Sequence, residues 1–270
     1  MTHIPFQAIA VDMDGTFLTD KKDYDHDLFT AVLNAAHKNN IRFITASGNQ
    51  FYKLQKDFGA HATAIDYVAE NGAYLLQGGK TLDYTAIDNS LIPLVLEYLQ
   101  PQTSVHVIIS GLKQAYCLTT TPQTFRDVVH FYYPETTEVS SYADVPVGQE
   151  PILKLSLDVP WEQTDQIADG IRTYFGNQFH ITSSGNGSID ILAPDVNKAT
   201  GLKQLLTTHG IKLDQLIAFG DNGNDAEMLK AAGLSYAMSN GIDAVKNIAD
   251  HEAPSNNENG VLKVLADYLL

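Results

Sequence analysis

Two carboxylates follow the first apolar run of the chain at a spacing that could do chemistry. Asp12 and Asp14 stand at positions i and i+2 after residues 6–11, and Gly15 and Thr16 come next. Because Gly15 allows the chain to turn, both carboxylates can converge on one pocket. Two like charges at short range repel each other unless a cation lies between them or one of them carries a proton. The pattern indicates a divalent metal site, an acid–base pair or both, and a solvated Asp-rich turn is the alternative.

Further polar groups stand at the ends of other expected elements. They are Ser47-Gly48-Asn49 after the run 41–46, Lys198 at the start of a helix expected over 198–209, and Gly220-Asp221-Asn222-Gly223-Asn224-Asp225 after the run 216–219. A small hydroxyl residue and a glycine between a strand and a helix aim backbone N–H groups at an anion. Taken singly, Ser47 and Gly48 are also typical of a plain helix cap, and Lys198 is also typical of a surface lysine.

Together these residue types suit phosphoryl transfer. A carboxylate can attack phosphorus and form an aspartyl-phosphate that water then hydrolyses. Mg²⁺ prefers carboxylate oxygens with water and phosphate oxygens, which suits Asp12, a neighbouring backbone carbonyl and Asp221. The charge that develops on the transferred group needs fixed donors and a cation. Ser47 and Gly48 can supply the donors, and Lys198 is the candidate cation.

The elements that would position these groups are strands alternating with helices. This alternation predicts parallel strands joined by right-handed crossovers, and such sheets bind ligands at the carboxyl ends of their strands. Between residues 84 and 189 the pattern changes to adjacent strands with intervening helices, which predicts an α+β unit with an antiparallel sheet. We therefore expect a Rossmann-like α/β core from residues 1–83 and 190–270, interrupted by a cap over residues 84–189.

Composition limits the classes of partner and compartment. The chain has 270 residues, a formal net charge of −15 and one cysteine, Cys117. The negative field repels nucleic acid and anionic membrane surfaces, whereas a small phosphorylated substrate remains compatible because a bound metal inverts the charge locally. The lone cysteine fits a reducing compartment, and no segment approaches about 18 consecutive apolar residues. We expect a cytoplasmic protein with no nucleic-acid or membrane partner, and its oligomeric state stays open.

The motifs stand in the order found in haloacid dehalogenase-like phosphatases, and the chain resembles their Cof-type branch, which includes sugar phosphatases. The resemblance covers the whole chain, including the inserted cap. It implies that Asp12 is the nucleophile and a metal ligand. It implies that Asp14 is the general acid and then the base, with its backbone carbonyl on the metal. One departure is Asn49, because Ser47-Gly48-Asn49 stands where Thr-Gly-Arg is frequent.

The resemblance also implies roles for the later motifs. Ser47, Gly48, Lys198 and Asn224 would hold the phosphoryl group, Asp221 would ligate Mg²⁺, and Asp225 would support both from beside them. In the cap, Gly185 and Asn186 belong to a tight turn that could face the substrate, and a plain hairpin is the alternative.

The expected function is that of a Mg²⁺-dependent phosphatase of small phosphorylated metabolites, with sugar phosphates as the expected substrates. A phosphomutase is an alternative because it shares the aspartyl-phosphate chemistry. A phospho-acceptor signalling domain also uses aspartates, a Ser or Thr, and a lysine on a parallel sheet. Such domains are about 100–150 residues long and lack both a cap and a Gly-Asp-x-Gly-x-Asp motif, so length and motif disfavour this class.

Overall fold

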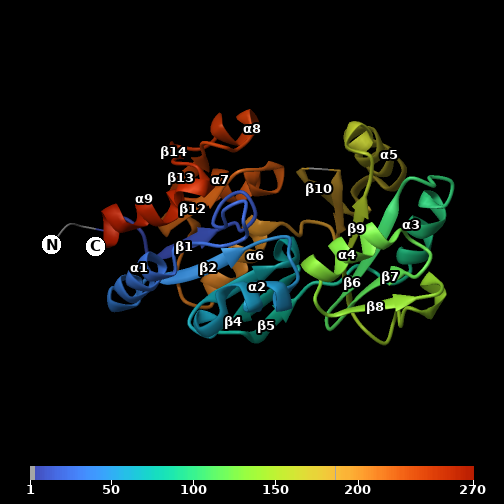
Figure 1. The fold of residues 1–270 in the computed structure, drawn as a ribbon, viewed down its shortest axis with the longest axis horizontal. Coiled ribbons are helices and arrows are strands. Elements are labelled where there is room, and N and C mark those ends of the chain that lie inside the picture. Colours follow the sequence, from blue (N-terminus) through green and yellow to red (C-terminus); the bar gives the residue numbers. More distant parts are fainter. Residues whose placement is uncertain (1–3, 186) are drawn as a thin grey trace.

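The chain folds into two lobes, each built on its own sheet (Figure 1). The computed structural model describes residues 4–185 and 187–270. An eight-stranded sheet has the order β14-β13-β12-β1-β2-β3-β4-β5, and a six-stranded sheet has the order β10-β11-β9-β6-β7-β8. The C-terminus lies at the end of the larger lobe that points away from the smaller one. The expected α/β core with an inserted α+β cap is confirmed.

The core sheet is parallel from β14 to β3 and ends in an antiparallel hairpin. Its strands are β1 (Ala8–Val11), β2 (Arg42–Ala46), β3 (Asp66–Ala69), β4 (Tyr74–Gln77), β5 (Lys80–Tyr84), β12 (Leu216–Gly220), β13 (Leu234–Met238) and β14 (His251–Ala253). β1 lies between β12 and β2, and Ala8 pairs in register with Leu216 on one side and Arg42 on the other. All four residues of β1 are buried, as an apolar run covered on both faces requires.

Helices cover both faces of this sheet, and alternate residues of β1 point to opposite faces. The helices on the two faces are α1 (His26–Lys38), α2 (Phe51–Phe58), α6 (Lys198–Thr207), α7 (Ala226–Ala231), α8 (Asp243–Lys246) and α9 (Gly260–Leu269). Ile9 and Val11 pack with α1, α2 and α9, whereas Ala8 and Ala10 pack with α6, α7 and α8. The small side chains on the second face let α6 lie close to the sheet. A Cβ atom on Gly201 of α6 would lie 2.8 Å from Val68 of β3.

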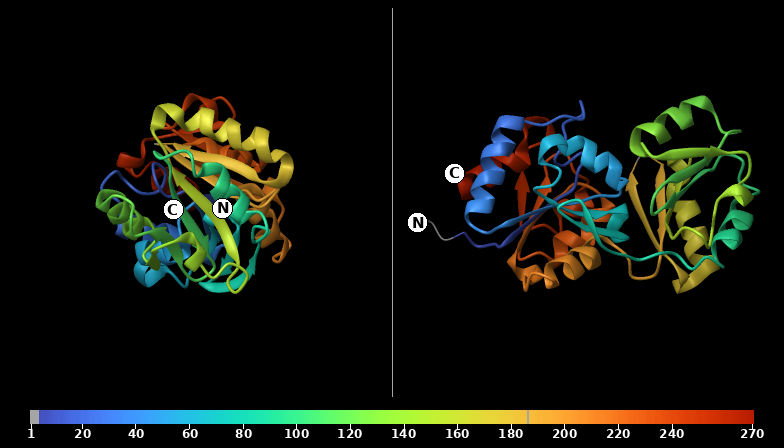
Figure 2. Two further views of the ribbon diagram at one scale, coloured as in Figure 1. Left: turned by 90° about the vertical axis from the view of Figure 1, so that its right-hand side faces the viewer. Right: turned by 90° about the horizontal axis from the view of Figure 1, so that it is seen from below.

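The cap sheet carries α3 and α5 on one face and α4 on the other. Its strands are β6 (His106–Gly111), β7 (Ala115–Leu118), β8 (Thr136–Val139), β9 (Ile152–Asp158), β10 (His180–Gly185) and β11 (Ser188–Leu192); its helices are α3 (Ile92–Leu99), α4 (Gln123–Tyr132) and α5 (Thr164–Phe175). α3 and α5 pack on residues such as Ile109 and Leu155, and α4 packs on Ile108 and Cys117. Figure 2 shows the two lobes joined by the connections on either side of the cap.

The cap departs from a purely antiparallel sheet at one pair of strands. β8 pairs with β7 in parallel, with Ala115 opposite Thr136. No strand is expected here from the sequence, because Thr136-Thr137-Glu138 is polar and lies between prolines. At the edge of a sheet such a polar strand is stable, since only one of its sides needs a partner. β7, α4 and β8 thus form a small parallel unit inside the cap.

The last strand of the cap sheet, β11, indicates at which residue the inserted unit ends. β11 pairs with β9 from Ser188 to Leu192 and with β10. We propose that the inserted unit extends to Leu192, beyond the position 189 expected from the sequence. No helix within residues 4–185 and 187–270 is long and apolar enough to cross a membrane.

Candidate active site

Asp12 continues β1 at the carboxyl end of the core sheet. Its amide donates to the Phe219 carbonyl at 3.1 Å, which extends the parallel ladder towards β12. The chain then turns at Gly15, whose φ is +80°. A Cβ atom there would lie 2.5 Å from Asp221 Oδ2, so only glycine leaves room for that carboxylate. Thr16 Oγ1 donates to Asp221 Oδ1 at 2.7 Å and ties the two loops together.

Lys198 lies beneath Asp12 and is fully buried. Asn197 caps α6 by accepting a hydrogen bond from the Thr200 amide, which places Lys198 at the first position of the helix. The Lys198 ammonium donates to Asp12 Oδ1 at 2.5 Å and to Asp225 Oδ1 at 2.6 Å. Asp225 Oδ2 accepts the backbone amides of Asp221 and Asn222. Both oxygens of Asp225 are therefore used to hold the lysine and to shape the loop after β12.

Three carboxylates gather around this lysine. Asp12, Asp221 and Asp225 each offer an oxygen within 4.8 Å of the others. Burial raises the pKa of Asp12 well above its usual range, Asp225 and Asp221 raise it further, and Lys198 opposes them. Burial and the nearby Asp225 likewise raise the pKa of Asp221 to about 6. A single ammonium does not balance these charges.

The donor set fits a hard divalent cation. One carboxylate oxygen of Asp12 accepts from Lys198, and one carboxylate oxygen of Asp221 accepts from Thr16. No donor among the described residues reaches the other oxygen of either group. All the candidate ligand atoms are oxygens, which Mg²⁺ prefers, and the excess negative charge would be offset by it. Asp12 and Asp221 would hold the metal, with Asp225 behind them. The Asp14 carboxylate is not part of this group.

Asp14 instead faces two donors that the sequence did not indicate together. Lys22 donates to Oδ1 at 2.5 Å, and Asn49 Nδ2 donates to Oδ2 at 2.8 Å. Burial lowers the pKa of Lys22, but the hydrogen bond and charge of Asp14 outweigh it, so that the pKa is raised overall. The Lys22 ammonium also lies 5.7 Å from the centre of the Tyr132 ring in the cap. Asn49 thus holds the predicted acid–base residue, a contact that its sequence motif does not reveal.

The loop of Ser47, Gly48 and Asn49 follows β2, and the carbonyl oxygen of each of its three residues accepts a hydrogen bond. The Asn71 amide donates to the Ser47 carbonyl at 2.9 Å, and the Glu70 amide donates to the Asn49 carbonyl at 3.2 Å. The Gly48 carbonyl accepts from Lys154 of the cap at 2.6 Å. Among the described residues, the Gly48 amide finds no acceptor. The loop can therefore offer this N–H group and the Ser47 hydroxyl to an anion.

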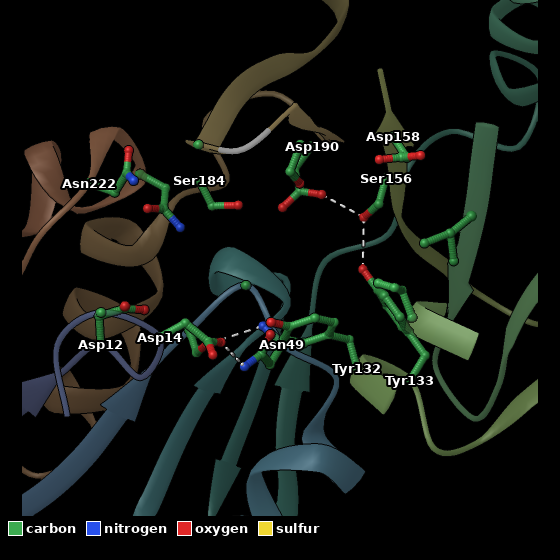
Figure 3. A pocket seen from close by; sticks show the side chains of 18 of the residues that line it. Asp12, Asp14, Asn49, Tyr132, Tyr133, Ser156, Asp158, Ser184, Asp190 and Asn222 are labelled. Carbon is green, nitrogen blue, oxygen red and sulfur yellow. Dashed lines mark hydrogen bonds between the residues drawn. The ribbon is translucent and has the colours of Figure 1, made fainter. Parts of the chain in front are cut away.

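A cavity of about 470 Å³ lies between the strand ends of the core and the cap. Figure 3 shows Asp12, Asp14 and Asn49 on one side of it, and Ser156, Asp190 and Tyr133 across from them. From the core it is lined by Asp12, Asp14, Gly15, Asp20, Lys22, Ser47, Gly48, Asn49, Asp221, Asn222 and Asn224; from the cap, by apolar and aromatic residues of α4 and by polar residues of β9 and β11. Carboxylates outnumber ammonium groups along its wall.

The structure brings most of the sequence-predicted residues to this cavity. Lys198 and Asp225 do not line it but lie directly behind Asp12. Gly185 lines it, with a φ of +84°, and a Cβ atom there would lie 2.8 Å from Asn222 Nδ2, so this glycine lies against the core. Asn186 falls outside the described residues. Sequence reasoning missed Lys22, Tyr132 and Lys154; of these only Lys154, a charge inside an apolar run, carries a local signal.

Known proteins resemble this chain along its whole length. The profile of the haloacid dehalogenase-like hydrolases matches residues 9–265. The 5-amino-6-(5-phospho-D-ribitylamino)uracil phosphatase YbjI of Escherichia coli is 37% identical over 259 residues, covering 96% of this chain and 94% of its own. The crystal structure of SMU.1108c from Streptococcus mutans superposes with a TM-score of 0.93 at 34% identity and covers 98% of this chain and 99% of its own.

A more distant structure shares the fold alone. The subclass IIB sugar phosphatase BT4131 superposes with a TM-score of 0.82 at 19% identity, covering 97% of this chain and 98% of its own. The core sheet with a mostly antiparallel cap sheet is therefore an arrangement that persists at low sequence identity.

Proposed function

Because the chain belongs to the haloacid dehalogenase-like hydrolase family and is a phosphatase of small phosphorylated metabolites, we propose that it cleaves them with Mg²⁺ through an aspartyl-phosphate on Asp12. The observation that carries this proposal is the contact of Asp12 with Lys198, beside Asp221 and at the wall of the cavity. Lys198 holds one oxygen of Asp12 and so fixes the orientation in which the carboxylate would attack phosphorus.

The first step transfers the phosphoryl group to Asp12. The carboxylate oxygen forms a bond to phosphorus while the bond from phosphorus to the leaving oxygen breaks, and Asp14 gives that oxygen a proton. Asp12, Asp221 and the Asp14 carbonyl would hold Mg²⁺, which when bound offsets the charge of the phosphate. The Ser47 hydroxyl, the Gly48 amide and Lys198 would stabilise the charge on the transferred oxygens, with Asn224 beside them.

The second step restores the enzyme. Asp14, now ionised, takes a proton from water as the water oxygen attacks phosphorus, and the bond from phosphorus to Asp12 breaks. Lys22 and Asn49 hold the two oxygens of Asp14 and so fix the direction in which the proton moves. For the leaving group to reach Asp14, it must share or displace one of these donors.

The cap side of the cavity suggests the class of leaving group. β9 and β11 present Ser156, Asp158 and Asp190, whose oxygens suit the hydroxyls of a polyol. α4 presents Phe125, Val128 and Tyr132, which suit a flat or apolar group. A sugar phosphate would contact only the polar wall, which β9 and β11 form, and not the apolar wall, which α4 forms. A phosphorylated polyol joined to a planar ring, such as the substrate in the name of YbjI, would use both walls.

Phosphate release from a panel of metabolites tests the proposal. The purified chain with Mg²⁺ should release phosphate from sugar phosphates and from 5-amino-6-(5-phospho-D-ribitylamino)uracil, and kcat/KM ranks the two classes. EDTA should abolish turnover and added Mg²⁺ should restore it, whereas Ca²⁺ should support it poorly because of its looser coordination. Transfer of phosphate to a second sugar hydroxyl, without release, would favour a phosphomutase. Absence of both reactions would refute the proposal.

A further inference from the structure

Lys154 is a buried cap lysine whose ammonium reaches the core. It lies on β9 with 1% of its surface exposed. Its Nζ donates to the Gly48 carbonyl at 2.6 Å. It also pairs with Glu70 Oε2 at 2.9 Å and approaches Asp190 Oδ2 at 3.4 Å. The Lys154 side chain of the cap therefore contacts the core loop that would bind the phosphoryl group.

Lys154 is charged in this position. Burial alone would lower the pKa of its ammonium, but Asp190 and Glu70 outweigh that effect and raise the pKa overall. The ammonium also lies 5.6 Å from the centre of the Tyr133 ring, where a cation is attracted to the aromatic face. A charged donor makes a stronger hydrogen bond to a carbonyl than a neutral one.

The contact of Lys154 fixes the orientation of one peptide group. The carbonyl of Gly48 and the amide of Asn49 belong to the same planar peptide and point in opposite directions. Holding the Gly48 oxygen towards Lys154 therefore holds the Asn49 amide towards Ser47, where it donates to Oγ at 3.2 Å. With an acceptor site of Oγ occupied, the Ser47 hydroxyl hydrogen is free to donate to the phosphoryl group.

The core contacts this peptide at its Asn49 amide, through the 3.2 Å bond to Ser47 Oγ, but among the described residues it gives no donor to the Gly48 carbonyl. The flanking carbonyls of Ser47 and Asn49 are held by the amides of Asn71 and Glu70, which come from η2 (Glu70–Gly72) of the core. The middle carbonyl is held by the cap, and it belongs to a glycine, whose backbone has the widest range of conformations.

We propose that Lys154 is a positioning residue that completes the phosphate-binding loop, so that the core binds a phosphoryl group fully only when the cap is docked. The inference rests on the proposed function of Ser47 and Gly48. Coupling of this kind is reciprocal: a bound phosphoryl group must favour the docked cap by the same factor by which docking favours its binding.

The test uses the paired substitution Lys154→Met with Glu70→Gln. Lys154→Met alone would leave Glu70 charged and buried, which destabilises the fold. The double variant removes the charges of Lys154 and Glu70, and the glutamine side chain retains the oxygen that accepts from Ser110 at 2.7 Å. Asp190 keeps its charge and its hydrogen bonds from Asn71 Nδ2 at 2.6 Å and Ser156 Oγ at 2.5 Å. The control is Lys53→Met with Asp57→Asn, which removes a largely buried pair at 2.5 Å in α2, where neither residue lines the cavity. Lys53 also lies 4.9 Å from the centre of the Phe131 ring in the cap, so the control removes a contact between core and cap that does not reach the phosphate-binding loop.

Binding of inorganic phosphate to the Mg²⁺-loaded full chain is measured by calorimetry. The Lys154–Glu70 double variant should bind phosphate about 10- to 100-fold more weakly, as expected for loss of a charge-assisted contact, and the control should change affinity by less than about twofold. Turnover of acetyl phosphate and of larger substrates should fall by the same factor, because the loop contacts only the phosphoryl group. Lys154→Arg, which keeps the charged donor, should recover part of the affinity.

Two results would overturn the inference. One is unchanged phosphate affinity in the folded Lys154–Glu70 double variant, and the other is a loss confined to larger substrates, which would make Lys154 a contact of the leaving group. Failure of the wild-type chain itself to bind or release phosphate would instead refute the proposed function.

Discussion

Replacement of Asp221 by asparagine should stabilise the metal-free protein at neutral pH. Burial and Asp225 raise the pKa of Asp221 from 3.8 to about 6. A tenfold change in an acid dissociation constant corresponds to about 1.4 kcal/mol, so ionised Asp221 costs the folded state about 3 kcal/mol at pH 7. The asparagine side chain keeps the oxygen that accepts from Thr16 at 2.7 Å and carries no charge.

The sign of the pH dependence follows from the direction in which the pKa moves. A carboxyl whose pKa is raised on folding is held in its protonated form by the folded state. Its stabilising contribution is fully present below about pH 4 and is lost as pH rises through about 6. In EDTA, Asp221→Asn and wild type should therefore have similar free energies of unfolding at pH 4. At pH 7 the variant should be more stable by up to about 3 kcal/mol.

Mg²⁺ should reverse this order. At 1,000 times its dissociation constant, a ligand stabilises the protein that binds it by about 4.1 kcal/mol, which exceeds the advantage of the variant, and the variant itself would gain far less. Urea unfolding followed by far-ultraviolet circular dichroism, with EDTA or Mg²⁺ at each pH, measures both effects. The only tryptophan, Trp161, is 72% exposed in the cap, so its fluorescence would report poorly on the core.

Asp225→Asn is the matched control for this experiment. Asp225 lies in the same loop but is paired with Lys198 at 2.6 Å, so its loss should destabilise the protein in EDTA at pH 7. If Asp221→Asn were less stable than wild type at pH 7 in EDTA, or differed from it equally at pH 4 and pH 7, the electrostatic reasoning would be wrong.

Three further substitutions test the site. Asp12→Asn should lower kcat by about 10⁴-fold or more, because an amide cannot attack phosphorus; full turnover, with deamidation excluded by mass spectrometry, would contradict this. Asp14→Asn should slow the hydrolysis of sugar phosphates by about 10²- to 10⁴-fold and that of p-nitrophenyl phosphate by less, since p-nitrophenolate leaves without a proton; equal losses would argue against Asp14 as the acid. Gly15→Ala should lower the free energy of unfolding by about 1–3 kcal/mol and weaken Mg²⁺ binding, because its Cβ atom would lie 2.5 Å from Asp221 Oδ2; an unchanged metal titration would contradict it.

The sequence alone predicts the structural features whose cause lies in neighbouring residues. The apolar run of β1 and the glycine after Asp14 predict a buried strand and a turn, and parallel pairing then brings several strand ends together. Gly78 and Gly79 predict the turn of a hairpin, and β4 and β5 form that hairpin on either side of them.

Features that depend on distant partners could not be predicted in the same way. Lys22 lies in the polar run Asp20-Lys21-Lys22-Asp23, which is typical of a solvated loop, and only the folded chain brings it to Asp14 and Tyr132. β14 has three residues, two of them exposed, so its pairing with β13 supplies the stability that its own sequence lacks. Lys154 sits in the apolar strand β9, and such a charge predicts a buried counterion without identifying it.

The place of β1 in the core sheet imposes an order on folding during synthesis. β1 is made before the cap, but its neighbour β12 ends at Gly220, more than two hundred residues later. The strands of the cap sheet, in contrast, all lie between His106 and Leu192 and can pair before β12 exists. A nascent chain should therefore carry a finished cap while one edge of β1 still lacks its partner. This apolar edge is open to chaperones or to other nascent chains until β12 has been made.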